Sequence, residues 1–331
     1  MSVPGSRASS GCRMRQADGA VTACAVSRPC LGSRAQTGGD MPGQLKQHEM
    51  GFWQLADIPS EAELAEYYSQ KYFTKEDASS HYAYAYEDRD LRHKLIQPTE
   101  TERVVGSEPR SLLEVGAGEG FTLAYFNRKG WDVKGVDFTA DAAREFNPDI
   151  ADKVIATDAF AWLDAEIDGP NRYDVVICNH VLEHVPDPCA LLSRLRGVVA
   201  PGGYVRISTP NDMSWLQDYI VATGRADPEY FVCVPDHINY FNAQTLRHVV
   251  EAHGFEIAEF LTEFPVDLFL LNDAANYMTD RTRGRGAHWA RTEFELALME
   301  RSIDDLIAFR RTCADIGIGR ALTVYARPSG G

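Results

Sequence analysis

The stretch SLLEVGAGEGF, residues 111–121, determines how this chain folds. An apolar run at 111–115 has the length and composition of a buried strand, and it leads directly into the glycine turn 116–120. A helical pattern begins at Phe121, so the turn joins a strand to a helix. Glycines at the carboxyl end of a strand let a ligand approach the backbone closely. The stretch therefore predicts a nucleotide-binding turn.

Strand and helix patterns alternate from this turn onward. The apolar runs expected to be strands lie at 111–115, 132–136, 153–156, 173–178, 204–208, 255–260 and 321–326. The helical patterns lie at 121–129, 140–146, 159–164, 189–199 and 243–253. Pro201-Gly202-Gly203 is read as the turn before the fifth strand. Alternation of this kind predicts an α/β fold with a doubly wound, mostly parallel sheet.

The regions before this core have a different composition. Residues 1–40 are rich in Gly, Ser, Ala and Arg without periodicity, which predicts a disordered extension, either upstream of a start at Met41 or Met50 or a targeting segment. Residues 41–98 are expected to form an N-terminal helical cap, with Ser60 as a helix N-cap. Within it Tyr82, Tyr84 and Tyr86 would either line a substrate mouth or pack under a helix.

The core, at 99–262, is followed by a long insertion. Residues 263–319 separate the core from the closing strand and tail at 320–331, and they include an amphipathic pattern over 291–311. Because insertions of this length are usually functional, we expect a helical lid or a homodimer face. Arg281, Arg283 and Arg285 would either meet an anionic acceptor or belong to a solvated loop.

Composition excludes several classes of protein. No apolar run approaches the roughly 20 residues that cross a bilayer, and no secretory signal is evident, so a cytoplasmic protein is expected. The net charge of −15 disfavours nucleic acid as a partner. The seven cysteines include no CxxC pair, so neither a zinc knuckle nor a disulfide framework is indicated.

The glycine spacing distinguishes between two nucleotide cofactors. Asp137 ends the second strand about twenty residues after the turn, where a carboxylate binds a ribose diol. The glycines read GxGxG, with Phe121 at the third glycine position of the dinucleotide pattern. Glu114 and Glu119 would repel a pyrophosphate but tolerate an ammonium or sulfonium group. S-adenosylmethionine (SAM) is therefore favoured over NAD, and an NAD-dependent oxidoreductase is the alternative.

Five segments in order carry a resemblance to a known family. They are LLEVGAGEG (112–120), VKGVDFT (133–139), VIATDAF (154–160), YDVVICNHVLEHVPDP (173–188) and APGGYVRISTPN (200–211). Together they resemble the successive motifs of class I SAM-dependent methyltransferases, including the methyltransferase-23 type. HVLEHVPDP (180–188) is similar to the equivalent stretch of ubiquinone-biosynthesis-type O-methyltransferases, and residues 235–257 resemble the sheet-closing region of their relatives.

The resemblance implies a seven-stranded sheet whose last strand is antiparallel between its neighbours, and a SAM site that releases S-adenosylhomocysteine (SAH). The implied cofactor-binding residues are Glu114, Gly116, Ala117, Gly118, Gly120, Asp137, Phe138, Asp158, Ala159, Asn179 and His180. The glycines would pass under the methionine part, with Glu114 near its amino group. Asp137 would bind the ribose, Asp158 with Ala159 would edge the adenine, and Asn179 with His180 would lie beside the sulfonium. Glu114 or Asp158 could instead cap a helix or be solvated.

Catalytic candidates follow two strand ends. His180, Glu183 and His184 belong to the first loop, and Asp236, His237 and Tyr240 to the second. A histidine suits a general base near neutral pH, so His184 or His237 is expected to act on a protonated acceptor. His180, Glu183 and His184 share one helical face and could hold a divalent metal, but an ordinary helix start is favoured and no metal is predicted.

These features predict a methyltransferase acting on a small-molecule acceptor such as a sugar or quinone-like metabolite, with O-methylation favoured. A non-catalytic regulator that keeps the fold is an alternative of a different class.

Overall fold

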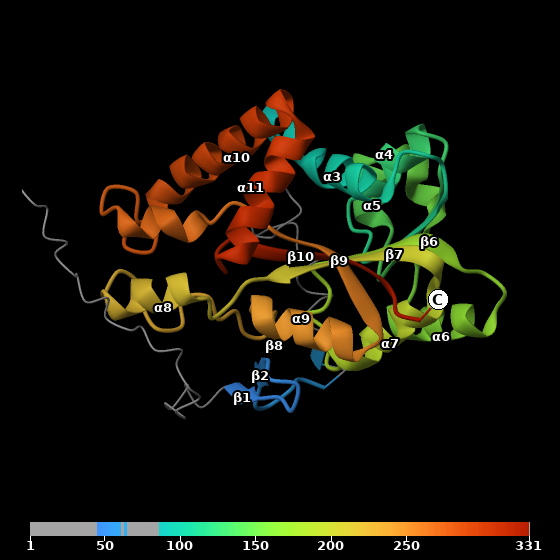
Figure 1. Cartoon of the computed structure of the whole chain (residues 1–331), viewed down its shortest axis with the longest axis horizontal. Helices are drawn as coiled ribbons and strands as arrows, with labels where there is room; N and C mark the ends of the chain where they lie inside the picture. Colours follow the sequence, from blue (N-terminus) through green and yellow to red (C-terminus); the bar gives the residue numbers. More distant parts are fainter. Residues whose placement is uncertain (1–44, 61–62, 65–85, 331) are drawn as a thin grey trace, which may run out of the picture. The chain divides into compact units, whose positions relative to one another are not determined.

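A seven-stranded sheet organises the chain (Figure 1). The computed structural model describes residues 45–60, 63–64 and 86–330. The strands of the large sheet are β3 (Ser111–Val115), β4 (Asp132–Asp137), β5 (Val154–Ala156), β6 (Tyr173–Asn179), β7 (Val199–Pro210), β9 (Phe255–Thr262) and β10 (Ala321–Pro328). Their order is β5-β4-β3-β6-β7-β10-β9, and β10 is antiparallel to both neighbours. The predicted sheet, including its antiparallel last strand, is confirmed.

Helices cover both faces of this sheet, as in a doubly wound fold. One hydrophobic cluster packs α6 (Ala159–Asp168), α7 (Pro188–Val198) and α9 (Ala243–Ala252) against one face. A second cluster packs α3 (Ile96–Val105), α4 (Phe121–Arg128), α5 (Asp141–Phe146), η1 (Pro148–Lys153) and α11 (Ile303–Asp315) against the other. Leu112 and Leu113 on β3 are fully buried on opposite faces because β3 lies at the centre.

The insertion contains two helices where the sequence predicted one. α10 (Gly284–Arg301) and α11 are separated at Ser302, whose backbone is extended and whose hydroxyl accepts from the Asp304 N–H as an N-cap. The prediction of one amphipathic helix over 291–311 was wrong, because a serine that begins a new helix interrupts the pattern. Before α10 lie two short 3-10 helices, η2 (Val266–Leu271) and η3 (Arg281–Arg283).

Pro201-Gly202-Gly203 lies within β7 rather than in a separate turn. Pairing with β6 passes from Tyr173–Val199 directly to Val175–Tyr204, so the intervening residues form an irregularity in the ladder. A Cβ at Gly203 would lie 2.8 Å from the Asp174 carbonyl oxygen. The close backbone approach explains why a glycine occupies this position.

The N-terminal region is only partly helical, so the prediction of a helical cap over 41–98 was incomplete. β1 (Leu45–Gln47), β2 (Trp53–Leu55) and β8 (Asn239–Tyr240) form a small three-stranded sheet. Phe52 is fully buried and packs on Phe241, which anchors this sheet to the core. The other helices whose bounds lie within the described residues are α2 (Asp88–Lys94) and, between β7 and β8, α8 (Trp215–Ala222).

The predicted N-cap at Ser60 is confirmed. Its hydroxyl accepts from the Glu63 N–H, and the Glu63 carboxylate accepts from the Ser60 N–H at 2.8 Å. The predicted extension at 1–40 and the tyrosines at 82 and 84 lie outside the described residues. No helix among the described residues is long and apolar enough to span a membrane.

Candidate active site

The predicted site residues gather at one edge of the large sheet. The glycine turn follows β3, Asp137 ends β4, Asp158 follows β5 and Asn179 ends β6. These four strands are parallel neighbours, so their carboxyl ends meet at the same edge. Ligands of open α/β sheets bind outside this edge.

Glycine is required in the turn for two different reasons. Gly116, Gly118 and Gly120 all have positive φ. A Cβ at Gly116 would lie 2.5 Å from Val181 Cγ2, so this position needs the close approach of the loop after β6. A Cβ at Gly118 would meet no atom within 4 Å, so the turn faces open space there. The backbone N–H groups of Gly116 and Ala117 donate to the Val136 carbonyl at 2.8 and 3.3 Å.

Asp137 is tied to this turn. Its Oδ2 accepts from the Gly118 N–H at 2.8 Å, which links the turn after β3 to the end of β4. Burial raises the pKa of Asp137, against the hydrogen bonds from the backbone N–H groups of Gly118, Thr139 and Phe138. The next side chain, Phe138, is 64% exposed at the same edge.

Asp158 lies one strand further along. The Thr157 N–H donates to the Asp137 carbonyl at 2.8 Å, which links the two strand ends. The exposed Asp158 caps α6, because its Oδ1 accepts from the Ala161 N–H at 2.8 Å. One alternative reading of Asp158, a helix cap, is thus present in the structure, and Ala159 begins α6.

Glu114 and Glu119, the two acids of the turn region, have different environments. Glu114 is 4% exposed on β3, its Oε2 has no hydrogen-bond partner among the described residues, and burial raises its pKa to about 8. Glu119 accepts from Lys94 Nζ at 2.7 Å and from the Tyr86 hydroxyl. Because Lys94 neutralises Glu119 and burial favours the protonated form of Glu114, neither acid is a free anion, and the sequence argument from anionic groups is not supported. Glu114 would become anionic beside a bound ammonium group.

Tyr86 and α2 cover the turn from the N-terminal side. The Tyr86 ring packs against Phe121 and Phe146, with ring centroids 5.9 and 5.4 Å apart. Lys94 Nζ lies 5.0 Å from the Tyr86 ring. The described part of the predicted tyrosine cluster therefore packs beside the glycine turn.

The loop after β6 is held by an ion pair. His180 has a φ of 51°, and its Nδ1 lies 3.0 Å from Glu183 Oε1. The His180 side chain is 49% exposed, and the hydrogen bond and charge of Glu183 outweigh its partial desolvation and raise the pKa of His180. Burial alone would raise the pKa of Glu183, yet the hydrogen bond with His180 and the charges of His180 and His184 lower it to about 2.

His184 and His237 meet across two loops. Their ring centroids lie 5.0 Å apart in an edge-to-face arrangement. His184 Nδ1 lies 2.6 Å from the Asp236 carbonyl oxygen. Because a carbonyl only accepts, Nδ1 carries the proton and the basic lone pair of the neutral ring is on Nε2. Burial and then the charge of His184 lower the pKa of His237 to about 4.

The same two loops bring together a candidate metal-binding group. Ligand atoms of Glu183, His184 and His237 all lie within 4.8 Å of one another. The sequence placed His180, not His237, in this group, but His180 pairs with Glu183 Oε1 through its Nδ1 and is not one of the three residues of the group. Glu183 is 1% exposed, and its Oε2 and His237 Nδ1 have no hydrogen-bond partner among the described residues. Two imidazoles and a carboxylate suit a divalent transition metal.

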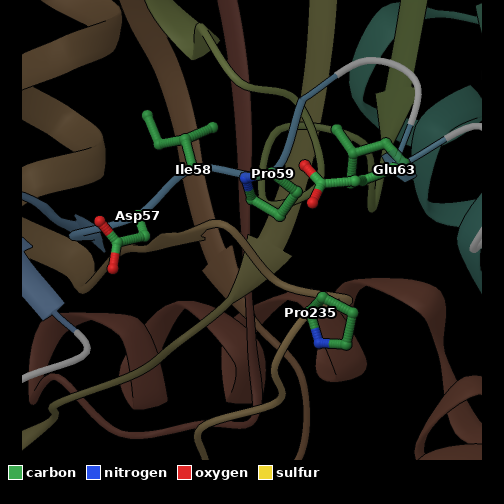
Figure 2. Close-up of a pocket in the computed structure, with 6 residues that line it drawn as sticks. Asp57, Ile58, Pro59, Glu63 and Pro235 are labelled. Atoms are coloured by element: carbon green, nitrogen blue, oxygen red, sulfur yellow. The ribbon is translucent and has the colours of Figure 1, made fainter.

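A pocket of about 360 Å³ borders the loop that carries His237 (Figure 2). It is lined by Asp57, Ile58, Pro59, Glu63, Leu64 and Pro235. Pro59 and Glu63 lie across the pocket from Pro235, which is two residues before His237. The pocket has an apolar wall, two carboxylates and no cation among its lining residues.

Two buried charged residues that the sequence did not single out, Arg206 and Asp212, also border the site. Arg206 on β7 is 4% exposed and donates to Asn179 Oδ1, and Asp212 just after β7 is 1% exposed, with Arg320 Nη1 3.4 Å from its Oδ1. The signal for Arg206 was a charged residue inside an apolar strand, although its partners are far away in sequence. The expected basic cluster is largely paired, because Arg283 binds Asp280 and Arg285 binds Glu87.

Comparison with known proteins agrees with this geometry. The methyltransferase-domain family matches residues 84–259, more than half of the chain. The ubiquinone biosynthesis O-methyltransferase of Serratia proteamaculans is 29% identical over 169 residues, 46% of this chain and 69% of that relative. Its counterpart from Klebsiella pneumoniae strain 342 is 30% identical over 166 residues, with the same coverage.

Two solved methyltransferases also align with the chain. A SAM-dependent methyltransferase from Archaeoglobus fulgidus has a TM-score of 0.45 and 19% identity, covering 71% of this chain and 94% of that one. The 1,6-didemethyltoxoflavin N1-methyltransferase of Burkholderia thailandensis has a TM-score of 0.45 and 16% identity, covering 86% and 99%. From the family match and the sheet topology together, the chain belongs to the class I SAM-dependent methyltransferases, and its cofactor is SAM.

Proposed function

We propose that this methyltransferase transfers a methyl group from SAM to an oxygen of a small-molecule acceptor, with His184 as the general base. The observation that carries the proposal is the hydrogen bond from His184 Nδ1 to the Asp236 carbonyl, which puts the basic nitrogen of the neutral ring on Nε2. O-methylation is the activity in the names of the relatives from Serratia and Klebsiella.

The residues at the sheet edge fit the parts of SAM. The open side of Gly118 gives the methionine part room to pass the turn, and the unpartnered Oε2 of Glu114 suits its ammonium group. Asp137 has a carboxylate held in place by backbone N–H groups, which suits a ribose diol. Phe138 and the Asp158–Ala159 pair would flank the nucleoside, and Asn179 with His180 would border the methionine part.

Bound SAM supplies a methyl group already activated by the positive sulfur, so this chain has mainly to bind, orient and deprotonate the acceptor. An acceptor hydroxyl needs a base as it becomes a nucleophile. His184 is poised for this because the Asp236 carbonyl fixes its tautomer. His237, with a pKa lowered to about 4, stays neutral beside it and does not compete for the proton.

The pocket in Figure 2 is the proposed place for the body of the acceptor. Its volume of about 360 Å³ lies in the range of small-molecule sites. Pro235 lines it and belongs to the same loop as Asp236 and His237, so an occupant would lie beside the loop that supports His184. Asp57 and Glu63 would disfavour an anionic acceptor.

Calorimetric titration of the full chain with SAM and SAH, with NADH as competitor, tests the cofactor site first. A screen with methyl-labelled SAM follows, using sugars, catechols and hydroxyquinones beside matched amines, and mass spectrometry locates the label. Label on a hydroxyl oxygen, lost in His184→Ala, supports the proposal. Label on nitrogen or carbon, or NADH displacing SAM, contradicts it. SAM binding without turnover of any acceptor class favours the non-catalytic alternative.

A further inference from the structure

A row of paired residues crosses the sheet beneath the proposed SAM site. Glu114 on β3 pairs with Ile177 on β6, Ile177 with Arg206 on β7, and Arg206 with Tyr325 on β10. Residues directly paired across strands point to the same face of a sheet. Asn179 is two residues beyond Ile177, so it lies on this face nearer the carboxyl edge. An acid and an arginine thus share one face just below the site.

Arg206 uses its whole guanidinium on side chains from three elements. Its Nε donates to the Tyr325 hydroxyl at 3.0 Å, its Nη2 lies 3.6 Å from Glu100 Oε1 on α3, and its Nη1 donates to Asn179 Oδ1. A buried arginine held in this way has little freedom to reorient. Arg206 therefore acts as a fixed donor toward Asn179.

This contact fixes which way the Asn179 amide points. Arginine only donates, so the atom of Asn179 that faces it must be the amide oxygen. The Ser208 hydroxyl donates to the same oxygen at 3.2 Å. The amide NH₂ of Asn179 is consequently directed away from Arg206, and it can only donate. A sulfonium cation offers nothing to such a donor, whereas a carboxylate does.

The rest of the network explains how a buried arginine is tolerated beneath the site. Glu100 Oε2 accepts from Arg310 Nη1 at 2.7 Å, and Tyr325 donates to Glu100 Oε1 at 2.8 Å. Arg310 on α11 also donates to Glu295 on α10 at 2.5 Å. Charges therefore alternate from Arg206 outward, so each buried charge is compensated.

We propose that Arg206 is a positioning residue that orients Asn179 to bind the carboxylate of SAM. This inference rests on the proposed cofactor site and refines the place of Asn179 within it, from the sulfonium to the carboxylate. The Asn179 donor and the Oε2 of Glu114, on the same face, then complement the carboxylate and the ammonium group of SAM. Arg206 acts through the orientation of Asn179, because Glu100 compensates its charge.

The proposal is tested by calorimetric titration of the full chain with SAM and with decarboxylated SAM, which lacks only the carboxylate. The ratio of the two affinities is the quantity compared. The wild type is expected to bind SAM at least about tenfold more tightly, as for hydrogen bonds to a charged group. In Arg206→Met the affinity for SAM should fall about tenfold while that for decarboxylated SAM stays within about twofold. Asn179→Asp keeps the contact with Arg206 but replaces the donor by an anion, so it should give the same loss.

Arg310→Met is the matched control, since it removes a buried arginine of the same network that does not contact Asn179. It should lower thermal stability and leave the affinity ratio unchanged. An equal loss of affinity for both ligands in Arg206→Met, or an unchanged ratio of the two affinities in Asn179→Asp, would overturn the proposal. Neither result would contradict the SAM site itself. If Arg206→Met does not fold, Asn179→Asp decides alone. A wild type that binds neither ligand would refute the cofactor site itself.

Discussion

The two halves of the site are held in place by different kinds of contact. On the β4–β3 side, backbone N–H groups donate the hydrogen bonds that fix the geometry. The Gly118 N–H donates to Asp137, and the N–H groups of Gly116 and Ala117 donate to the Val136 carbonyl. On the β6 side the geometry depends on side chains, such as the His180–Glu183 pair and the contact of His184 with Asp236, 52 residues away. The backbone contacts follow from the pairing of two adjacent parallel strands, whereas the contact of His184 with Asp236 joins two loops that no local pattern brings together.

The side-chain half should show the largest effect on the rate. His184→Ala removes the proposed base, and general bases contribute roughly 10²–10⁴-fold, so kcat with a hydroxyl acceptor should fall by that factor at unchanged SAM affinity. Steady-state kinetics with a hydroxyl acceptor measures kcat, and calorimetric titration measures the affinity for SAM.

His253→Ala is the control for His184→Ala, because His253 Nδ1 makes the same kind of bond to a carbonyl, that of Val249, at 2.7 Å on α9. It should change kcat by less than about twofold, as expected of a surface substitution. His237→Ala should cost less than His184→Ala, because a pKa lowered to about 4 makes His237 the weaker base. The reverse order would transfer the role of base to His237.

In the backbone-held half, Asp137→Ala should have the largest effect on cofactor affinity. It removes the carboxylate proposed to bind the ribose and the acceptor of the Gly118 N–H, so the Kd for SAH should rise by roughly 100-fold, as for two hydrogen bonds to a charged group. Asp158→Ala should raise the Kd by less than about tenfold. Calorimetric titration with SAH measures both.

Asp187→Ala is matched to Asp158→Ala, since Asp187 caps α7 through the Ala190 N–H at the same 2.8 Å. Each substitution should cost about 1 kcal/mol of stability as a lost N-cap. Only Asp158→Ala should also lower the affinity for SAH. If both substitutions leave the affinity for SAH unchanged, Asp158 is only a helix cap.

The same division explains what the sequence could predict. The glycine turn, Asp137 at a strand end and the alternation of strands and helices follow from local patterns. The antiparallel last strand was implied by the resemblance to the family, and the structure confirms it. The meeting of His184 with His237 and the pairing of Arg206 with Glu100 depend on tertiary contacts that periodicity does not report. Sequence reasoning therefore named both histidines but could not place them in contact, and it put His180 rather than His237 beside His184 in the metal-binding group.

The errors in secondary structure have a similar origin. The N-terminal residues 53–55 are too few to show a strand period, and β2 forms because it pairs with β8, where Gln54 bonds Asn239 across 185 residues. The single helix predicted over 291–311 failed at Ser302, where a local capping preference overrides a continuing amphipathic pattern. In both cases a short stretch depends on a contact that an averaged pattern does not register.

The free energy of unfolding should depend on the ion pair between His180 and Glu183. Because the folded pKa of Glu183 is about 2 against an ordinary 4.5, its contribution is present above pH 4.5 and is lost as the pH falls toward 2. The pKa of His180 is raised above 6.5. The stability that protonated His180 contributes is therefore present below pH 6.5 and is lost as the pH rises through the folded pKa. Glu183→Gln should therefore be less stable than the wild type by roughly 2 kcal/mol near pH 5.5.

Urea unfolding of the wild type and Glu183→Gln at pH 5.5 and pH 3 measures this difference. It should shrink at pH 3, where Glu183 of the unfolded wild type is protonated. Glu166→Gln offers a comparison from outside the site. Burial would raise the pKa of Glu166, but hydrogen bonds from Tyr173 and Asn171 outweigh it and lower the pKa. A difference for Glu183→Gln that does not depend on pH would mean that packing, not charge, holds the loop.

The smallest effect is expected from removing metal ions. If Glu183 forms an ion pair with His180 and His184 acts as a base, dialysis against EDTA should change the rate by less than about twofold. Deprotonation of the acceptor by a histidine needs no metal. The assay is the rate before dialysis, after it, and after adding Zn²⁺ or Mg²⁺, with metal content measured by mass spectrometry. A larger loss restored by one ion would make Glu183, His184 and His237 its ligands. His237→Ala would then abolish the restoration, whereas His180→Ala would not, because His180 lies outside the group whose ligand atoms fall within 4.8 Å.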